Sequence, residues 1–99
     1  MLYAIIATDV PNSVLLRPQV RPRHLLYLQP LIDQGRVVFA GPHPAIDSPD
    51  PGPAGFTGSL IVAEFASLDE AKAWSAKDPY VVEGVFAEVA IKPVVQVHP

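Results

Sequence analysis

Four short apolar segments, separated by two segments with a helical pattern, constrain the fold of this chain more than any other feature of its sequence. The apolar segments cover residues 2–8, 36–40, 59–65 and 85–91, and turn-forming Pro, Gly or Asp residues lie beside each of them. Short apolar runs that end at turn formers are typical of buried strands. The helical segments lie between the first and second runs and between the third and fourth. The predicted order is therefore strand, helix, strand, strand, helix, strand.

The first helical segment carries an apolar stripe of Leu25, Leu28 and Ile32, with Leu31 beside them, at the spacings of three and four that place residues on one face of a helix. We expect this helix to begin close to Pro22, because the first helical turn tolerates a missing N–H group. Pro30 lies inside the segment and is expected to bend the helix.

The second helical segment has clear signals at both ends. Ser67 and Glu70 form a capping-box pattern, which predicts a helix start at this point. Asp78 precedes Pro79, and a residue before proline avoids helical backbone angles, so the helix is expected to end there. Residues 80–84 are expected to form a short connector to the last strand.

Strand–helix–strand units cross over with one handedness, so the predicted order closes most simply as a four-stranded antiparallel sheet with both helices on one face. This is an α+β, ferredoxin-like β-α-β-β-α-β arrangement. Gly41 and Pro42 are expected to end the second strand, and residues 44–58 form a loop rich in proline and glycine. We expect this loop to line a pocket or a subunit seam, with Phe56 as its apolar anchor.

A chain of 99 residues has room for one hydrophobic core, so we expect a single domain over residues 1–99. Apolar residues make up 49% of the chain and charged residues 17%, which leaves much apolar surface to cover. Helices on one face of the sheet leave the other face open. Two open faces packed together would form a homodimer, a dimeric α+β barrel.

Charge and cysteine content exclude several classes of protein. The formal net charge is -3 and the basic residues are scattered, so we do not expect nucleic acid binding. The chain contains no cysteine, which excludes disulfides and thiolate chemistry and fits the cytoplasm. The first residues lack the pattern of a signal peptide, and no apolar run approaches membrane-spanning length.

Several segments resemble the YCII family (YciI-like proteins), in the same order along residues 1 to 95. They are Arg-Pro-Arg-His-Leu at 21–25, Gln-Gly-Arg at 34–36, Ala-Gly-Pro at 40–42, the loop segments 47–52 and 54–59, Ala-Lys-Ala-Trp at 71–74 and Asp-Pro-Tyr at 78–80. The resemblance implies a dimeric α+β barrel with a pocket that holds His24 and Asp78 as catalytic residues. It implies no particular reaction.

His24 and Asp78 each have a simpler structural interpretation. A histidine beside an apolar helical stripe is most often a packed, hydrogen-bonded core residue, and an aspartate before proline is usually a turn residue. Because both helices lie on one sheet face, the two side chains can also meet. A carboxylate on one ring nitrogen would then leave the other nitrogen to act as base or acid.

Four further residues are candidates for substrate binding. Arg21 would bind a carboxylate or phenolate through its guanidinium fork, and Tyr80 would donate a hydrogen bond to a substrate oxygen. Gly41 and Pro42 are candidates for the pocket wall. The alternatives are a solvated arginine, a tyrosine that packs against a turn, and a strand end.

The sequence predicts neither a metal nor a cofactor. His43, Asp47 and Asp50 follow no known ligand spacing, and no phosphate-binding glycine loop or dinucleotide motif is present. We therefore expect a cofactor-independent enzyme, a lyase or isomerase, that uses His24 and Asp78 on a small hydroxylated or cyclic organic molecule. The alternative is a module that binds a small ligand or another protein without turnover.

Overall fold

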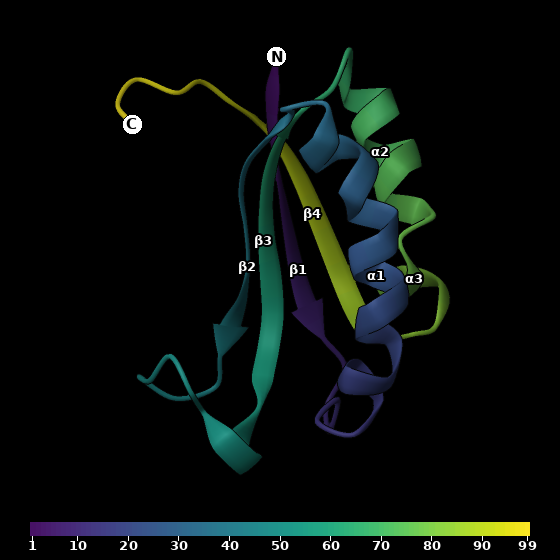
Figure 1. Cartoon of the computed structure of the whole chain (residues 1–99), viewed down its shortest axis with the longest axis vertical. Coiled ribbons are helices and arrows are strands. Elements are labelled where there is room, and N and C mark those ends of the chain that lie inside the picture. The colour runs from purple at the N-terminus through teal and green to yellow at the C-terminus, as the bar shows by residue number, and fades with distance from the viewer.

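The computed structural model describes residues 1–99, and Figure 1 shows the sheet with its helices along one side. The elements in chain order are β1 (Leu2–Asp9), α1 (Leu16–Asp33), β2 (Val37–Pro44), the 3₁₀ helix η1 (Gly52–Ala54), β3 (Phe56–Glu64), α2 (Leu68–Ala76), α3 (Pro79–Val82) and β4 (Phe86–Val94).

The four strands form one antiparallel sheet in the order β2-β3-β1-β4, and the helices cover one of its faces. The predicted ferredoxin-like α+β fold is therefore confirmed. Because the two central strands β1 and β3 lie far apart in sequence, the sheet joins the first half of the chain to the second. None of the helices is both long and apolar enough to cross a membrane.

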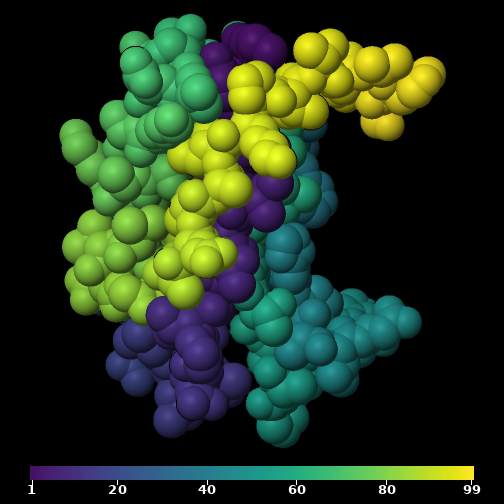
Figure 2. All heavy atoms as spheres, turned by 180° about the vertical axis from the view of Figure 1, so that it is seen from behind, coloured from purple at the N-terminus to yellow at the C-terminus, as the bar shows by residue number.

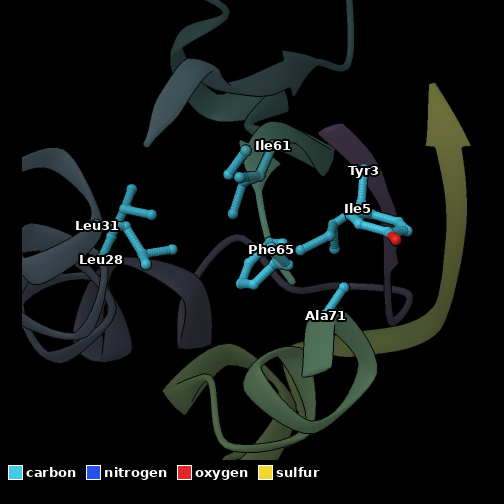
Figure 3. Close-up of a cluster of buried hydrophobic side chains, with 8 residues drawn as sticks. Tyr3, Ile5, Leu28, Leu31, Ile61, Phe65 and Ala71 are labelled. Atoms are coloured by element: carbon cyan, nitrogen blue, oxygen red, sulfur yellow. The ribbon is translucent and has the colours of Figure 1, made fainter. Parts of the chain in front are cut away.

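The main hydrophobic core lies between the helices and this face of the sheet (Figure 3). On β1, Tyr3, Ile5 and Ala7 are buried, while the residues between them are more exposed, as the period of two in a strand requires. Ile61 of β3 and Phe65, which follows β3, belong to the same cluster. A second, smaller cluster lies toward the other end of the sheet and contains Val20, Tyr80 and Val85.

Helix α1 begins at Leu16, so the predicted start near Pro22 is wrong. The added turns bury Arg17 and Val20 against the sheet, and this packing outweighs the hydrogen bond that Pro22 cannot make. Of the predicted apolar stripe, Leu28 and Leu31 are buried as expected. Leu25 and Ile32 are 41% and 46% exposed and line a pocket instead.

The strands also extend beyond their predicted limits. Gly41 and Pro42 do not end β2, which continues to Pro44, with Pro42 opposite Ser59 of β3. Likewise β4 continues to Val94 through Pro93. Both are edge strands that pair on one side only, and proline is tolerated where no neighbour needs its N–H. Because β3 begins at Phe56, the predicted loop is shorter than residues 44–58.

The expected connector at residues 80–84 is partly helical. Pro79–Val82 form the one-turn helix α3, with Pro79 in its first turn. Asp78 caps this helix, because its Oδ1 accepts a hydrogen bond of 2.9 Å from the Tyr80 N–H. The cap fixes the backbone on both sides of Asp78, so the direction of its carboxylate is fixed as well.

The sheet face opposite the helices is uncovered and mostly apolar. Strand register places the apolar residues Leu2, Ala4, Ile6, Phe39, Leu60, Val62, Ala90 and Val94 on it, together with the polar residues Thr8, His43, Glu64, Glu88 and Lys92. Phe39 is 52% and Ile6 38% exposed. The loop between β2 and β3 and the C-terminal residues project beyond the sheet on the side away from the helices (Figure 1). From behind, the surface between these two projections is hollowed (Figure 2).

Candidate functional site

A pocket of about 480 Å³ lies between α1 and the β2–β3 side of the sheet. Helix α1 supplies its charged wall, with Arg17, Arg21 and His24. The opposite wall comes from β2 and β3 and includes Ala40, Gly41, Pro42, Phe56, Ser59 and Ile61. The pocket is therefore mostly apolar, with a few polar groups on facing walls, as in small-molecule sites.

His24 and Asp78 are in direct contact. His24 Nδ1 lies 2.8 Å from Asp78 Oδ1 and 3.0 Å from Asp78 Oδ2. The residues are 7% and 2% exposed. Asp78 Oδ1 also accepts the N–H of Tyr80, so the carboxylate is held from both the imidazole and the backbone. The contact between these two side chains, which the sequence left as one of two interpretations, is present in the fold.

The second imidazole nitrogen of His24 opens into the pocket. His24 makes no hydrogen bond other than those of Nδ1 to Asp78, and no buried side-chain nitrogen or oxygen in the chain lacks a partner. Nε2 must therefore be accessible, and His24 lines the pocket. A carboxylate on Nδ1 favours the tautomer with its proton on that nitrogen. Nε2 then carries the lone pair and is able to accept a proton from a bound molecule.

Tyr80 packs directly against the imidazole. The two rings are stacked, with centroids 4.1 Å apart and an interplanar angle of 20°. The pKa of the Tyr80 phenol is raised above its usual 10.0 by burial, and Asp78 and Asp9 raise it further, whereas Arg17 and Arg21 act in the opposite direction. At neutral pH the phenol is thus protonated. Tyr80 lines the pocket, and its hydroxyl makes no hydrogen bond within the chain.

A buried ion pair between Arg17 and Asp9 lies beside the His24 and Tyr80 rings. Arg17 Nη1 donates to both carboxylate oxygens of Asp9, at 2.7 and 3.0 Å, and Arg17 Nη2 donates to Ser59 Oγ. Ser13 Oγ donates to Asp9 Oδ2 at 2.7 Å. The guanidinium also lies over the Tyr80 ring, 4.6 Å from its centroid. Arg17 thus connects strands β1 and β3 to the rings beside His24.

The sequence did not predict Arg17, Asp9 or Ser59 as site residues. One signal was available for Asp9, which continues the inward alternation of Tyr3, Ile5 and Ala7. A charged residue at an inward-facing strand position needs a buried partner. No comparable signal pointed to Arg17, because it lies before the predicted start of the helix.

The other predicted substrate-binding residues also lie at the pocket. Arg21 lines it, is exposed and forms no ion pair, whereas Gly41 and Pro42 belong to the β2 wall. Phe56 lines the pocket and is half-buried, but the residues from 45 to 55 do not. His43, Asp47 and Asp50 do not come together, and nowhere do three or more His, Asp or Glu side chains gather as a metal site would require.

Comparisons with known proteins agree with this architecture. Residues 1–95 match the YCII-related domain. Protein YciI of Escherichia coli O6:H1 is 56% identical over 93 residues, which cover 94% of this chain and 95% of that protein. An uncharacterized protein of Haemophilus influenzae is 50% identical over 93 residues, again with 94% and 95% coverage.

A solved structure also resembles the chain along nearly its whole length. It is 5-chloro-2-hydroxyhydroquinone dehydrochlorinase from Burkholderia phenoliruptrix AC1100, in complex with 2,5-dihydroxybenzoquinone. The two structures superimpose with a TM-score of 0.85 at 28% sequence identity, over 96% of this chain and 94% of that one. From the extent of the sequence match and the identities to its relatives, the chain belongs to the family defined by the YCII-related domain.

Proposed function

We propose that this protein is a cofactor-independent enzyme that catalyses elimination or isomerisation of a small, cyclic, hydroxylated organic molecule. One observation carries the proposal: His24 Nδ1 is held by Asp78 while Nε2 opens into a pocket of about 480 Å³. A buried carboxylate–imidazole pair with one free ring nitrogen is the arrangement that general acid–base catalysis requires.

In the proposed elimination, His24 Nε2 takes a proton from a C–H or O–H group of the ring. The electron pair of that bond forms a new double bond, and the leaving group departs from the ring with its own bonding pair. In an isomerisation the same imidazole returns the proton to another atom. The charge of the imidazolium is balanced by the carboxylate of Asp78, 2.8 Å from Nδ1.

The lining of the pocket supports a ring with acidic hydroxyl groups as the substrate. Arg21 is a cation without an ion-pair partner, and a guanidinium binds phenolate or carboxylate oxygens. Leu25, Leu28 and Ile61 supply apolar surface for the ring itself. The structural relative described above is a dehydrochlorinase in complex with a dihydroxybenzoquinone, which supports the same substrate class.

The direct test is to incubate the purified protein with 5-chloro-2-hydroxyhydroquinone in buffer without added cofactor. Chloride release is measured with an ion-selective electrode, and the organic product is followed by its absorbance. We expect release above the rate in buffer alone. If neither this compound nor a panel of hydroxylated aromatics is converted, the proposed activity is wrong.

A second candidate function is binding without turnover. The His24 side chain is only 9% exposed, which favours a role in shaping the pocket over contact with a reacting atom. Titration calorimetry with 2,5-dihydroxybenzoquinone distinguishes the two functions. Binding that persists in His24→Ala, with no product formed from any ring by the wild type, would identify a binding module.

We also propose that two copies pack through their uncovered sheet faces as a homodimer, the dimeric α+β barrel. The apolar residues on that face and the projections at both ends of the hollow support this packing. Both edge strands contain proline, which disfavours association through the edges.

Val62→Lys is expected to separate the dimer, because it places a charge in the middle of the uncovered face. Sedimentation should give about twice the 10.7 kDa chain mass for the wild type and 10.7 kDa for the variant. Leu26→Lys is the control, since Leu26 is 74% exposed on α1. This variant should sediment with the same mass as the wild type. A wild-type protein that sediments as a stable monomer at micromolar concentration would contradict the proposal.

A further inference from the structure

We infer that Ser59 is the hydrogen-bond donor for the substrate oxygen that becomes negatively charged when His24 takes the proton, and that the buried Arg17–Asp9 pair positions it. This inference rests on the proposed function and adds a second polar contact to the same pocket. It assigns the β3 wall a role in stabilising the charged intermediate, opposite the base on α1.

The one hydrogen bond of the Ser59 side chain leaves its hydroxyl hydrogen free to donate. Ser59 Oγ accepts a hydrogen bond from Arg17 Nη2, so the guanidinium occupies one side of the oxygen. The hydroxyl hydrogen has no acceptor within the chain, although Ser59 is only 5% exposed and lines the pocket. A buried hydroxyl without an acceptor in the protein is free to donate to a ligand. Because its oxygen accepts from a cation, it is also a stronger donor than an ordinary serine.

Arg17 is held rigidly enough to fix Ser59. Its Nη1 is bound by both oxygens of Asp9, and Asp9 in turn accepts from Ser13. The side chains of Arg17 and Asp9 are 9% and 2% exposed. Two further aromatic rings, those of Phe56 and Phe86, have centroids 5.9 and 6.0 Å from the guanidinium carbon. A donor held in this way needs little reorganisation when charge develops on the substrate.

The arrangement of the two walls indicates the chemical class of the ligand. His24 belongs to α1 and Ser59 to β3, so a flat ring between the walls meets the base from one side and the donor from the other. Arg21, on α1 and exposed, is placed to bind a second oxygen. The pocket therefore suits a ring with at least two oxygen substituents, one of which gains negative charge when a proton is removed.

The test uses 2,5-dihydroxybenzoquinone as the probe, with wild type, Ser59→Ala and Ser59→Thr. Calorimetry should show binding about 10- to 100-fold weaker for Ser59→Ala, the range expected for a lost hydrogen bond to a charged group. Infrared difference spectra should show the C–O stretch of the bound probe at higher wavenumber in Ser59→Ala, since a hydrogen bond lowers it. Ser59→Thr keeps the hydroxyl and should recover both signals. Ser48→Ala, in the loop outside the pocket, is the control with unchanged binding.

A variant at Arg17 tests the positioning role separately. Arg17→Lys keeps a positive charge for Asp9 but loses the second guanidinium nitrogen that reaches Ser59. We expect Arg17→Lys to bind the probe more weakly than the wild type but more tightly than Ser59→Ala. The C–O stretch of the bound probe should shift to higher wavenumber, as in Ser59→Ala.

The outcomes separate this inference from the proposed function. If Ser59→Ala binds the probe as tightly as the wild type, with the same C–O band, the role of Ser59 is wrong. In that case chloride release by the wild type would still support the enzyme activity. If the wild type neither binds the probe nor converts a ring, both proposals fail. Thermal melting of each variant establishes that it is folded. If Ser59→Ala is unfolded, Arg17→Lys, which removes the hydrogen bond to Ser59 Oγ, tests the inference in its place.

Discussion

Replacing Asp9 with alanine is expected to lower the free energy of unfolding by about 3–5 kcal/mol, the range for a buried ion pair that loses one partner. The cause is the Arg17 guanidinium, which would remain buried without a counter-charge. Ser13 would also lose its 2.7 Å hydrogen bond to Asp9 and keep only the Phe56 carbonyl, at 3.4 Å, as an acceptor. Denaturation in urea at a fixed protein concentration measures the loss, since association can add to stability.

Glu83→Ala is the matched control, because it removes an ion pair whose side chains are 57% and 43% exposed. Its cost is expected to stay within about 1 kcal/mol, as for most surface pairs. The double variant Asp9→Leu with Arg17→Met should recover most of the stability, since it leaves no unpaired charge. An Asp9→Ala variant as stable as Glu83→Ala would show that Arg17 finds water or another partner.

The order of the elements could be predicted from local patterns alone. The apolar run that forms β1 and the cap at Ser67, whose Oγ accepts from the Glu70 N–H, are local features and were predicted correctly. The start of α1 was not, because proline signals are local whereas the burial of Val20 depends on β4 and α3. The limits of β2 and β4 were missed for a related reason: whether a proline is tolerated depends on the edge position of the strand.

The residues of the candidate site also differ in whether the sequence could reveal them. The family resemblance supplied His24 and Asp78, but their contact joins residues 54 positions apart and depends on α2 and α3. Arg17 and Ser59 are 42 positions apart, and neither lies in a recognisable motif. The predicted helix began after Arg17. Because of this error, Arg17 was not recognised as the residue that binds both Asp9 and Ser59 at the pocket.

The Asp78→Asn variant should retain the fold and lose most of the activity. Asp78 Oδ1 faces the Tyr80 N–H, and an amide oxygen is able to replace it as the cap of α3. Both carboxylate oxygens lie close to His24 Nδ1, Oδ1 at 2.8 Å and Oδ2 at 3.0 Å. An amide nitrogen in place of Oδ2 would bring its N–H group against the Nδ1 hydrogen, unless Nδ1 gives up that hydrogen and accepts instead. The imidazole proton would then move to Nε2. A ring nitrogen that already carries a proton has no lone pair left, so Nε2 could not accept a proton from the substrate.

We therefore expect chloride release from 5-chloro-2-hydroxyhydroquinone to fall by about 10²- to 10⁴-fold in Asp78→Asn, the usual contribution of general acid–base catalysis. His24→Ala should be equally slow, and the double variant no slower, because the two residues act as one unit. Nitrogen-15 spectra of the His24 ring report the tautomer directly. Asp78→Ala separates structure from chemistry: it also loses the cap and should be less stable than Asp78→Asn by about 1 kcal/mol. If the Asp78→Asn variant keeps wild-type turnover although the imidazole proton of His24 lies on Nε2, His24 is not the base.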